Sequence, residues 1–308
     1  MIAAIIGKGS IGKRHGKNLK KIGHEVFYVR RKKSNNKNDI LFSELSNKID
    51  FFIVSNPTSL HISTIKKILK FKKPILVEKP LAHKNSLDLK KISKNNNIFI
   101  GYQMRYDQRI NLLKKHIRKN KKYYANITWL TSMPVWHQNE NYLKSYSSQK
   151  KLGGGVTLTL SHEIDLAYYI FGKVKSISVI NLKNTLNIDV EDKIIVYLEH
   201  YNGCISRVYL NFASRFSERK IEVYDQKSKL IYDFNKNYIY KNSNIKKNNY
   251  KCHVNKDKIY LLEIVDFINS IKLNKNSTCR INIKNTFHTQ KVLNKIIKKI
   301  NLKYCLSV

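Results

Sequence analysis

Three glycines near the start of the sequence have the spacing of a turn that can bind a dinucleotide. Gly7, Gly9 and Gly12 follow a short apolar run and precede a helical pattern. In such a turn the first glycine permits a tight bend, the second lets the backbone approach a pyrophosphate, and the third lets the helix pack closely on the strand. The helix start, at Ser10 and Ile11, would direct free N–H groups toward the phosphates. The motif predicts a dinucleotide site.

The residues after the second apolar run bear on which dinucleotide fits. An Asp or Glu about 20 residues past the glycines would accept a hydrogen bond from the adenosine ribose 2′-OH. This chain has Arg30 and Arg31 there. Because guanidinium groups suit a phosphate monoester, we expect NADP, with NAD as the second candidate. The alternative is a solvated basic turn in a lysine-rich protein.

Polar residues follow two later apolar runs. The first loop contributes Ser55, Asn56, Pro57 and His61, and the second contributes Glu78 and Lys79. In a parallel sheet both loops lie at the carboxyl edge, where ligands bind. We therefore expect these loops to border the dinucleotide.

Glu78 and Lys79 have side chains suited to the oxidation of an alcohol or the reduction of a carbonyl. Glu78 can accept a hydrogen bond from a ribose hydroxyl, and Lys79 can donate to an alkoxide. A positively charged nicotinamide nearby would lower the pKa of the lysine, which suits proton transfer near neutrality. Pro80 permits a cis peptide bond that would re-aim Lys79. The alternative is an exposed Lys-Pro turn.

A second candidate group follows the glycine-rich run at 153–155. Ser161 would cap the helix that follows, and His162 would lie in its first turn, where the helix dipole favours neutral imidazole. Asp165, three residues further on, would share the face of His162. The alternative is a histidine that packs against the glycine-rich loop. Leu166 occupies the position that a second histidine would need in HExxH, so we expect no metal.

Four other side chains are candidates for contact with the nicotinamide or the substrate. Gln103 could touch the nicotinamide end. Arg105 could pair with a phosphate of the substrate or cofactor, or form an interdomain salt bridge instead. Trp136 and Tyr146 could stack on a sugar ring, with core or interface packing as the alternative for both.

The formal net charge of +38 raises the question of a nucleic-acid partner. Of the 59 basic residues 10 are Arg, which leaves 49 Lys, whereas recognition of grooves and phosphates favours Arg. The lysines are spread along the whole chain, and no known nucleic-acid-binding motif accompanies them. We therefore expect no nucleic-acid partner, although a positive surface would steer anionic small molecules inward.

Other classes are also disfavoured by composition. No stretch approaches the roughly 18 apolar residues of a membrane span, and the first apolar run is too short for a signal peptide. The four cysteines, Cys204, Cys252, Cys279 and Cys305, lack CxxC spacing and indicate free thiols in a reducing compartment. We expect a cytoplasmic protein without a membrane anchor.

The pattern of elements divides the chain in two. Residues 1–121 alternate short strands with helical stretches, which is typical of a parallel, doubly wound α/β sheet. The strands are expected at Ile2–Ile6, 26–29, Phe51–Val54, 75–77 and Ile98–Gly101, and the helices near 11–22, 60–71, 87–94 and 109–119.

Residues 122–308 have consecutive strands joined by short polar turns, which predicts an α+β domain with a largely antiparallel open sheet. We expect loops and one short strand over 234–255. The strands are expected at 124–129, 174–179, 192–200, 204–212, 219–224 and 230–233, and the helices at 161–171, 260–271 and 285–300.

These motifs, in this order, resemble the Gfo/Idh/MocA family, the relatives of glucose–fructose oxidoreductase and inositol dehydrogenase. The resemblance is carried by GKGSIGKRH at 7–15, SNPTSLH at 55–61, VEKP at 77–80, GYQMRY at 101–106 and LGGGVTLTLSHEID at 152–165. It implies an N-terminal Rossmann domain, a C-terminal α+β domain for substrate binding and oligomerisation, and a homo-oligomer (dimer or tetramer). It also implies hydride transfer between NAD(P) and a secondary alcohol or ketone of a sugar or sugar derivative.

The resemblance also implies roles for individual residues. Lys79 matches the catalytic lysine, Glu78 the residue at the nicotinamide ribose, and His162 the active-site histidine. Leu158 stands where many sugar and polyol dehydrogenases of the family carry Asp. This departure keeps open an alternative, a non-catalytic protein that binds a dinucleotide or a sugar nucleotide. The stretch around Trp136 looks like that of members tied to surface-sugar biosynthesis.

Overall fold

The computed structural model describes the backbone of residues 1–32, 34–118, 121–136, 141–182, 184–243, 247–251 and 255–305. The chain forms two compact units. The first comprises Met1–Tyr106 and Lys256–Phe287, and the second comprises Asp107–Asn255 and His288–Val308. The domain boundary between residues 121 and 122 stays a prediction. The sequence analysis assigned residues 256–287 to the C-terminal domain, whereas the structure groups them with the N-terminal part.

The first unit contains a six-stranded, all-parallel sheet in the order β3-β2-β1-β4-β5-β6. This order confirms the predicted doubly wound fold. Strand β3 was not expected, because three residues are too few to show a period. The strands are β1 (Ile2–Ile6), β2 (Glu25–Arg30), β3 (Asp39–Leu41), β4 (Phe51–Val54), β5 (Ile75–Glu78) and β6 (Ile98–Gly101).

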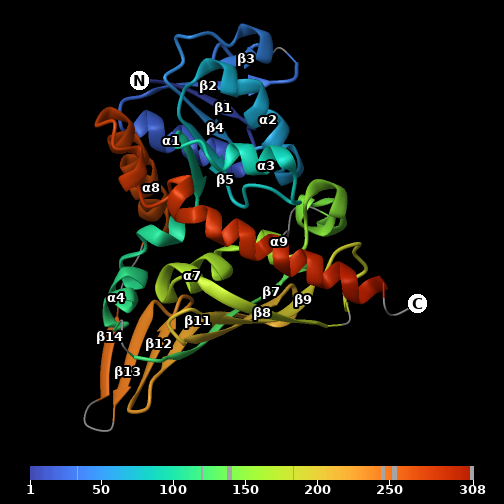
Figure 1. The fold of residues 1–308 in the computed structure, drawn as a ribbon. Coiled ribbons are helices and arrows are strands. Elements are labelled where there is room, and N and C mark those ends of the chain that lie inside the picture. Colours follow the sequence, from blue (N-terminus) through green and yellow to red (C-terminus); the bar gives the residue numbers. More distant parts are fainter. Residues whose placement is uncertain are drawn as a thin grey trace. The chain divides into compact units, whose positions relative to one another are not determined.

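Helices of the first unit come from both ends of the chain. Phe267, on a helix near the C-terminus, packs edge-on against Phe51 and Phe99, with ring centroids 5.4 and 4.8 Å apart. That helix, α8, lies beside α1 (Figure 1). The α-helices are α1 (Ser10–Lys21), α2 (His61–Ile68), α3 (Leu87–Ile92) and α8 (Lys256–Lys272), and the 3-10 helices are η1 (Phe42–Glu44), η2 (Thr58–Leu60), η3 (Leu69–Phe71), η4 (Gln103–Tyr106) and η8 (Asn276–Thr278).

The second unit contains an eight-stranded sheet in the order β14-β13-β12-β11-β7-β10-β9-β8. Its neighbours pair antiparallel except β7 and β10, which are parallel. The expectation of a single short strand over 234–255 was wrong, since β13 and β14 both lie there. The strands are β7 (Tyr124–Ser132), β8 (Val174–Asn181), β9 (Lys193–His200), β10 (Ile205–Asn211), β11 (Ala213–Tyr224), β12 (Ser228–Asp233), β13 (Tyr238–Ser243) and β14 (Lys247–Lys251).

One face of this sheet packs on helices. Alternate residues of β9, namely Ile194, Val196 and Leu198, are buried, as the period of a strand requires. Helix α7 contacts β7 and β10 and covers the sheet in Figure 1. The helices are α4 (Gln108–His116), α5 (Met133–Trp136), α6 (Val156–Thr159), α7 (His162–Phe171) and α9 (Ile283–Cys305), whose first residues belong to the first unit, with η5 (Tyr142–Lys144), η6 (Tyr146–Ser148) and η7 (Lys150–Leu152).

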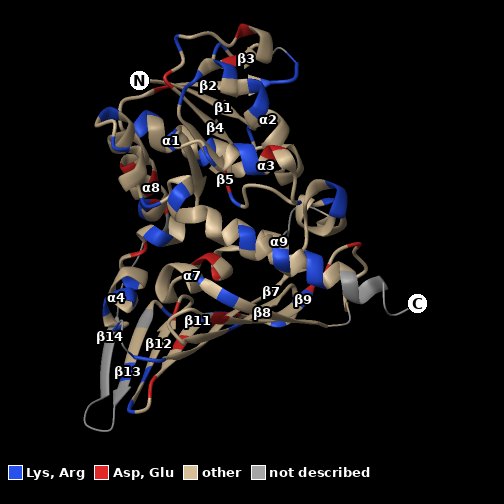
Figure 2. Ribbon diagram, in the orientation of Figure 1, with Lys and Arg blue, Asp and Glu red and all other residues tan. Residues whose placement is uncertain are grey.

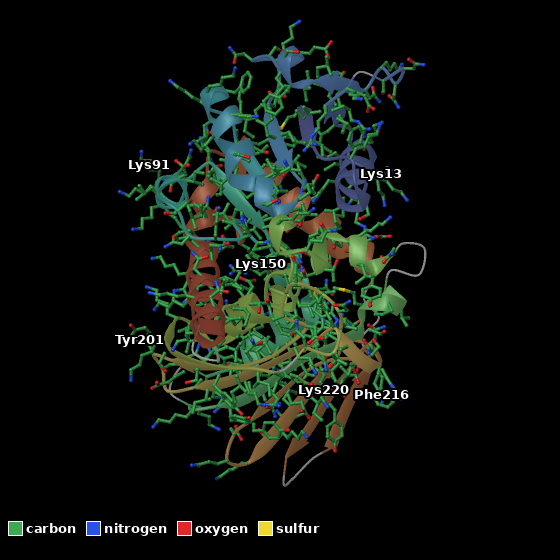
Figure 3. All side chains as sticks on the ribbon, turned by 90° about the vertical axis from the view of Figure 1, so that its right-hand side faces the viewer. Lys13, Lys91, Lys150, Tyr201, Phe216 and Lys220 are labelled. Atoms are coloured by element: carbon green, nitrogen blue, oxygen red, sulfur yellow. The ribbon has the colours of Figure 1, made fainter. Side chains whose placement is uncertain are left out.

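Basic residues occur in both units. Figure 2 shows Lys and Arg spread over helices and strands of both units, as the sequence led us to expect. Two large aromatic side chains of the second unit, Tyr201 and Phe216 (Figure 3), are 72% and 78% exposed. Within the described residues, no helix combines the length and apolar character needed to cross a membrane.

Candidate functional site

The three glycines of the turn differ in what surrounds them. A Cβ at Gly7, whose φ is +110°, would lie 2.6 Å from the backbone of Ser55 and Asn56, and one at Gly12 would lie 1.9 Å from the carbonyl oxygen of Gly7. A Cβ at Gly9 would meet nothing within 4 Å. The protein's own packing therefore requires the first and third glycines. The second borders an open space, which fits the close approach of a pyrophosphate.

The start of α1 faces the same turn. Gly9 is its N-cap and supplies no side-chain hydrogen bond, and its first turn carries no acidic residue. The first N–H groups of a helix have no acceptor within the helix and carry the positive end of its dipole. Ser10 is exposed and Ile11 half-buried. The arrangement fits an anionic ligand, as the sequence predicted for these two residues.

Ser55 supports the turn from the end of β4. Its Oγ donates to the carbonyl oxygen of Gly7 at 2.8 Å, and a Cβ at Gly12 would lie 2.8 Å from that Oγ. The hydroxyl therefore holds the glycine turn in shape. Contact of Ser55 with the cofactor itself stays a prediction.

A carboxylate lies near the end of β2, next to the predicted arginine. Asp39 Oδ1 is 2.6 Å from Lys8 Nζ, and Asp39 Oδ2 is 3.9 Å from Arg30 Nε. Burial opposes the ionisation of Asp39, but hydrogen bonds from Lys8 and Ser34 outweigh it and lower its pKa. Arg30 and Arg31 are exposed. Sequence analysis missed Lys8 and Asp39, the latter because it begins the unforeseen strand β3.

His61 connects the loops that follow β4 and β5. Its Nδ1 lies 2.9 Å from the carbonyl oxygen of Pro80, and its Nε2 lies 2.9 Å from that of Asn56. Burial lowers the pKa of this imidazole. Asn56 Nδ2 donates to Thr64 at 2.8 Å, and Pro57 is the N-cap of η2. A neutral ring carries one N–H, so His61 donates to only one of the two carbonyls, and its contact with a cofactor stays a prediction.

Glu78 is the last residue of β5 and Lys79 follows it, at the strand end where the sequence placed them. The Lys79–Pro80 peptide bond is cis, and Lys79 is half-buried. Glu78 Oε1 lies 2.6 Å from Nε2 of His15, a fully buried residue of α1. His15 belongs to the motif at 7–15, yet its spacing gave no sign of this pairing.

Gln103 also lies in the first unit, in η4. Its Nε2 donates to Tyr260 Oη at 2.9 Å. Burial and, next, the carboxylate of Glu78 raise the pKa of Tyr260 to about 12, so the phenol is neutral at physiological pH. Helix α8 thus adds a residue to this group that lies 157 positions from Gln103. No local pattern could have revealed the contact.

Arg105 makes contacts that neither sequence-based expectation named. It is 2% exposed, and its Nη1 donates to the carbonyl oxygens of Arg280 at 3.0 Å and Asn285 at 3.1 Å. These contacts hold the segment after α8 within the first unit.

In the second unit His162 is the first residue of α7 and is 4% exposed. The expected cap by Ser161 was wrong, because Ser161 has helical backbone angles and makes no side-chain cap hydrogen bond. Helix α6 leads into α7, and the Glu163 N–H donates to the Leu160 carbonyl at 3.2 Å. At least one of the first N–H groups of α7 therefore already has a hydrogen-bond acceptor.

The carboxylates next to His162 have partners in the second unit. Asp165 Oδ1 accepts from Thr289 Oγ1 at 2.7 Å, and Glu163 Oε1 accepts from Arg219 Nε at 2.7 Å. Arg219 in turn lies over the Trp129 ring, 3.8 Å from its centroid. These contacts fix the helix that carries His162.

The other candidates for substrate contact differ in exposure. Tyr146 at the start of η6 is 40% exposed, whereas Leu158 of α6, which stands where many relatives carry Asp, is 4% exposed. Trp136 ends α5, and its side chain lies outside the described residues. No group of three or more His, Cys, Asp or Glu in the described part of the chain is arranged to hold a metal ion.

Comparison with known proteins matches two family models to separate parts of the chain. Residues 1–97 match the family model described as an oxidoreductase family with an NAD-binding Rossmann fold. Residues 124–231 match the model of the GFO/IDH/MocA C-terminal domain. The two matches cover the parts of the chain that carry the glycine turn and His162.

Curated relatives are distant. The chain is 24% identical over 200 residues to the uncharacterized oxidoreductase YrbE of Bacillus subtilis, an alignment that covers 56% of this chain and 54% of that protein. It is 23% identical over 261 residues to myo-inositol 2-dehydrogenase of Thermotoga maritima, with 76% and 75% covered. The chain thus spans about half of one relative and three quarters of the other.

Solved structures share the fold. Levoglucosan dehydrogenase, solved in complex with NADH, superposes with a TM-score of 0.82 at 14% identity, covering 97% of this chain and 96% of that one. From the two family models and the fold, we conclude that the chain belongs to the GFO/IDH/MocA family of oxidoreductases, with an N-terminal NAD-binding Rossmann fold.

Proposed function

We propose that the protein is an NAD(P)-dependent dehydrogenase or reductase that acts on a secondary alcohol or ketone of a sugar or sugar derivative. The observation that carries the proposal is the open space in front of Gly9 at the start of α1, on a sheet edge that also presents Glu78 and Lys79. The names of the inositol dehydrogenase relative and of levoglucosan dehydrogenase support a substrate of carbohydrate type.

The proposed roles follow the chemistry of the side chains. Nicotinamide, when bound, supplies or accepts the hydride. Glu78 accepts from a hydroxyl of the nicotinamide ribose, and Lys79 holds or moves the proton of the substrate hydroxyl. His162 assists with that proton. Tyr146, which is 40% exposed, offers a face for a sugar ring.

The decisive experiment measures turnover. Purified protein is mixed with NAD or NADP and a panel of polyols and sugars, and reduced nicotinamide is followed by its absorbance. Lys79→Ala should lower kcat by about 10²- to 10⁴-fold, the range for loss of a general acid or base, while the Kd for NADH stays within about twofold because no backbone of the glycine turn changes. Wild-type protein that binds NADH and turns over no member of the panel would favour the non-catalytic alternative.

For the cofactor we propose NADP over NAD. Arg30 and Lys8 place two cationic groups near the end of β2, and the buried carboxylate of Asp39 offsets only part of their charge. Arg30 keeps 43% of its side chain exposed and open to a 2′-phosphate.

Substitution of Arg30 tests this preference. Arg30→Ala should weaken NADPH binding by about tenfold or more, the worth of one charge-assisted hydrogen bond, and leave NADH binding nearly unchanged. Lys32→Ala, which removes an exposed cation from the same turn, serves as the control. Equal losses for NADH and NADPH in the Arg30 variant would count against the preference.

A further inference from the structure

A buried acid on α8, Glu263, shares a helix face with Tyr260, whose ring lies edge-on to the histidine that binds Glu78. Glu263 is 0% exposed, and neither of its carboxyl oxygens has a hydrogen-bond partner among the described residues. Burial and, next, the charge of Glu78 raise its pKa well above the ordinary value. An isolated carboxylate in such a place would be costly, so the acid is held in its neutral form.

The groups around Glu263 and its helical neighbour Tyr260 come from four elements of the first unit. Glu78 lies on β5 and is bound by His15 of α1, whose ring meets Tyr260 of α8 edge-on at 6.3 Å. Gln103 of η4 donates to the same tyrosine. The remaining charged or titratable groups nearby are Arg14, which lies over the Tyr260 ring, Asp257, which pairs with Arg14, and Tyr106.

None of these groups neutralises a second negative charge. Arg14 has 43% of its side chain exposed and pairs with Asp257 at 3.7 Å. His15 is already engaged by Glu78 at 2.6 Å. The cluster therefore balances one carboxylate, at Glu78, and accommodates the other carboxyl only while it carries its proton.

We propose that Glu263 is a positioning residue for the dinucleotide site, which in its neutral form keeps Glu78 placed to accept from the nicotinamide ribose. Loss of the Glu263 proton puts two like charges into one buried cluster, and their repulsion displaces Glu78 from His15. Dinucleotide affinity should therefore fall as the pH rises. The inference rests on the proposed function, since it assigns Glu78 to the ribose.

The sign of the effect follows from linkage. Folding raises the pKa of Glu263, so its neutral form stabilises the native state at acid pH. That contribution is lost as the pH rises from the ordinary Glu value, about 4.3, through the raised value. Within that window the equilibrium constant for unfolding of the first unit, from the native to the exchange-competent open state, should increase by up to about tenfold per pH unit.

Amide hydrogen exchange, read by mass spectrometry on peptides of β5 and α8, measures that opening without any cofactor. Tryptophan fluorescence cannot replace it, because Trp129 and Trp136, the only two tryptophans, both belong to the second unit. Glu263→Gln removes the titration and should flatten the pH dependence of exchange. Glu263→Met, an apolar replacement of similar size, should do the same and covers the case in which the amide folds poorly.

A double-mutant cycle separates coupling to Glu78 from burial alone. In a Glu78→Gln background the Glu263→Gln substitution should change the pH profile of exchange much less than it does in wild type. Glu191→Gln is the control, because Glu191 is a buried acid of the second unit whose pKa burial raises. It should leave exchange in β5 unchanged.

Titration with NADH over the same pH range completes the test. The wild-type Kd should rise with pH, and that of Glu263→Gln should stay level. An unchanged pH profile in both Glu263 variants, or an equal effect of Glu263→Gln with and without Glu78, would overturn the inference. Protein that binds neither NADH nor NADPH while the exchange cycle shows coupling would overturn the proposed function and leave the Glu263–Glu78 pair standing.

Discussion

Gly9 and Gly12 stand three residues apart, yet a methyl group at each position would meet a different environment. At Gly12 it would overlap the carbonyl oxygen of Gly7, 1.9 Å away. At Gly9 it would enter open space, and the φ of −73° there is one that alanine adopts readily. The two glycines therefore serve the fold and the ligand separately.

Alanine substitutions test this separation. Gly12→Ala should destabilise the first unit by about 3 kcal/mol or more through overpacking. Gly9→Ala should leave stability unchanged or raise it by about 0.5 kcal/mol and weaken NADH binding by about tenfold or more, because the new methyl group occupies the place of the pyrophosphate. Hydrogen exchange reports the first quantity and NADH titration the second.

The control for these substitutions is Lys13→Ala, an exposed position of the same helix that is labelled in Figure 3. It should change neither quantity. Loss of folding in Gly9→Ala, or NADH binding as tight as in wild type, would contradict the assignment of Gly9 to the ligand.

The place of a residue in the candidate site could be predicted from the sequence where its spacing from a strand was enough to locate it. The glycine turn and the Glu78–Lys79–Pro80 step follow strands, so their positions could be read directly. His15 and Glu263 could not, because His15 binds Glu78, 63 positions away on another element, and Glu263 lies on a helix that returns from the second half of the chain. Ser161 looked like a helix cap by type alone, and the short helix before it removed that need.

At the scale of elements, single histidines connect segments that are distant in sequence. His61 lies between the loops after β4 and β5, with one ring nitrogen 2.9 Å from a backbone carbonyl of each. His288, in α9, accepts a hydrogen bond from the Val174 N–H at the start of β8, at 2.9 Å. A ring nitrogen accepts only when it is unprotonated. The contact between α9 and β8 thus depends on neutral His288.

The pH dependence of the second unit should show this contact. Burial, with Lys291 and Lys173 next in effect, lowers the pKa of His288 from 6.5 to about 4. Because the folded value is the lower one, the contribution to stability is present above the unfolded value and lost as the pH falls from 6.5 toward 4. His288→Gln should reduce that acid loss, measured by urea unfolding with tryptophan fluorescence, which reports this unit.

A matched control is His116→Gln, which alters an exposed histidine of α4 in the same unit. It should leave the acid limb of the stability curve as it is in wild type. An acid limb that is equally steep in His288→Gln would mean that another group causes the loss.

Element types were predictable over most of the chain because apolar residues recur with the period of a strand or a helix. Strand β3 was missed for its length, and one short strand was expected over 234–255 where the structure has two, β13 and β14, in an Asn- and Lys-rich segment. The pairing of β7 with β10 is parallel, and the sequence, which predicted a largely antiparallel sheet, did not indicate where the exception would lie. Pairing between strands so far apart depends on the packed sheet rather than on either strand alone.

At the scale of the molecule, the N-terminal sheet is completed by a segment from the far end of the chain. The Ile100 N–H donates to the Ile281 carbonyl at 2.9 Å, and Arg105 donates to two further carbonyls of the returning chain. Phe267 is fully buried against two phenylalanines of the sheet. The first unit is therefore discontinuous in sequence, which a boundary drawn from local composition cannot reveal.

This discontinuity predicts how fragments fold. Residues 1–106 alone should lack a cooperative thermal transition by circular dichroism, because the face that Phe267 covers would be exposed. The same residues joined through a flexible Gly/Ser linker to 256–287 should unfold cooperatively. In the linked fragment Phe267→Ala should cost about 3–5 kcal/mol, the usual range for removing a buried phenyl ring, whereas Leu273→Ala, at a side chain 64% exposed, should cost little. A cooperative transition of residues 1–106 at the midpoint of the linked fragment would show that the returning segment is dispensable, and the Rossmann unit would then be continuous after all.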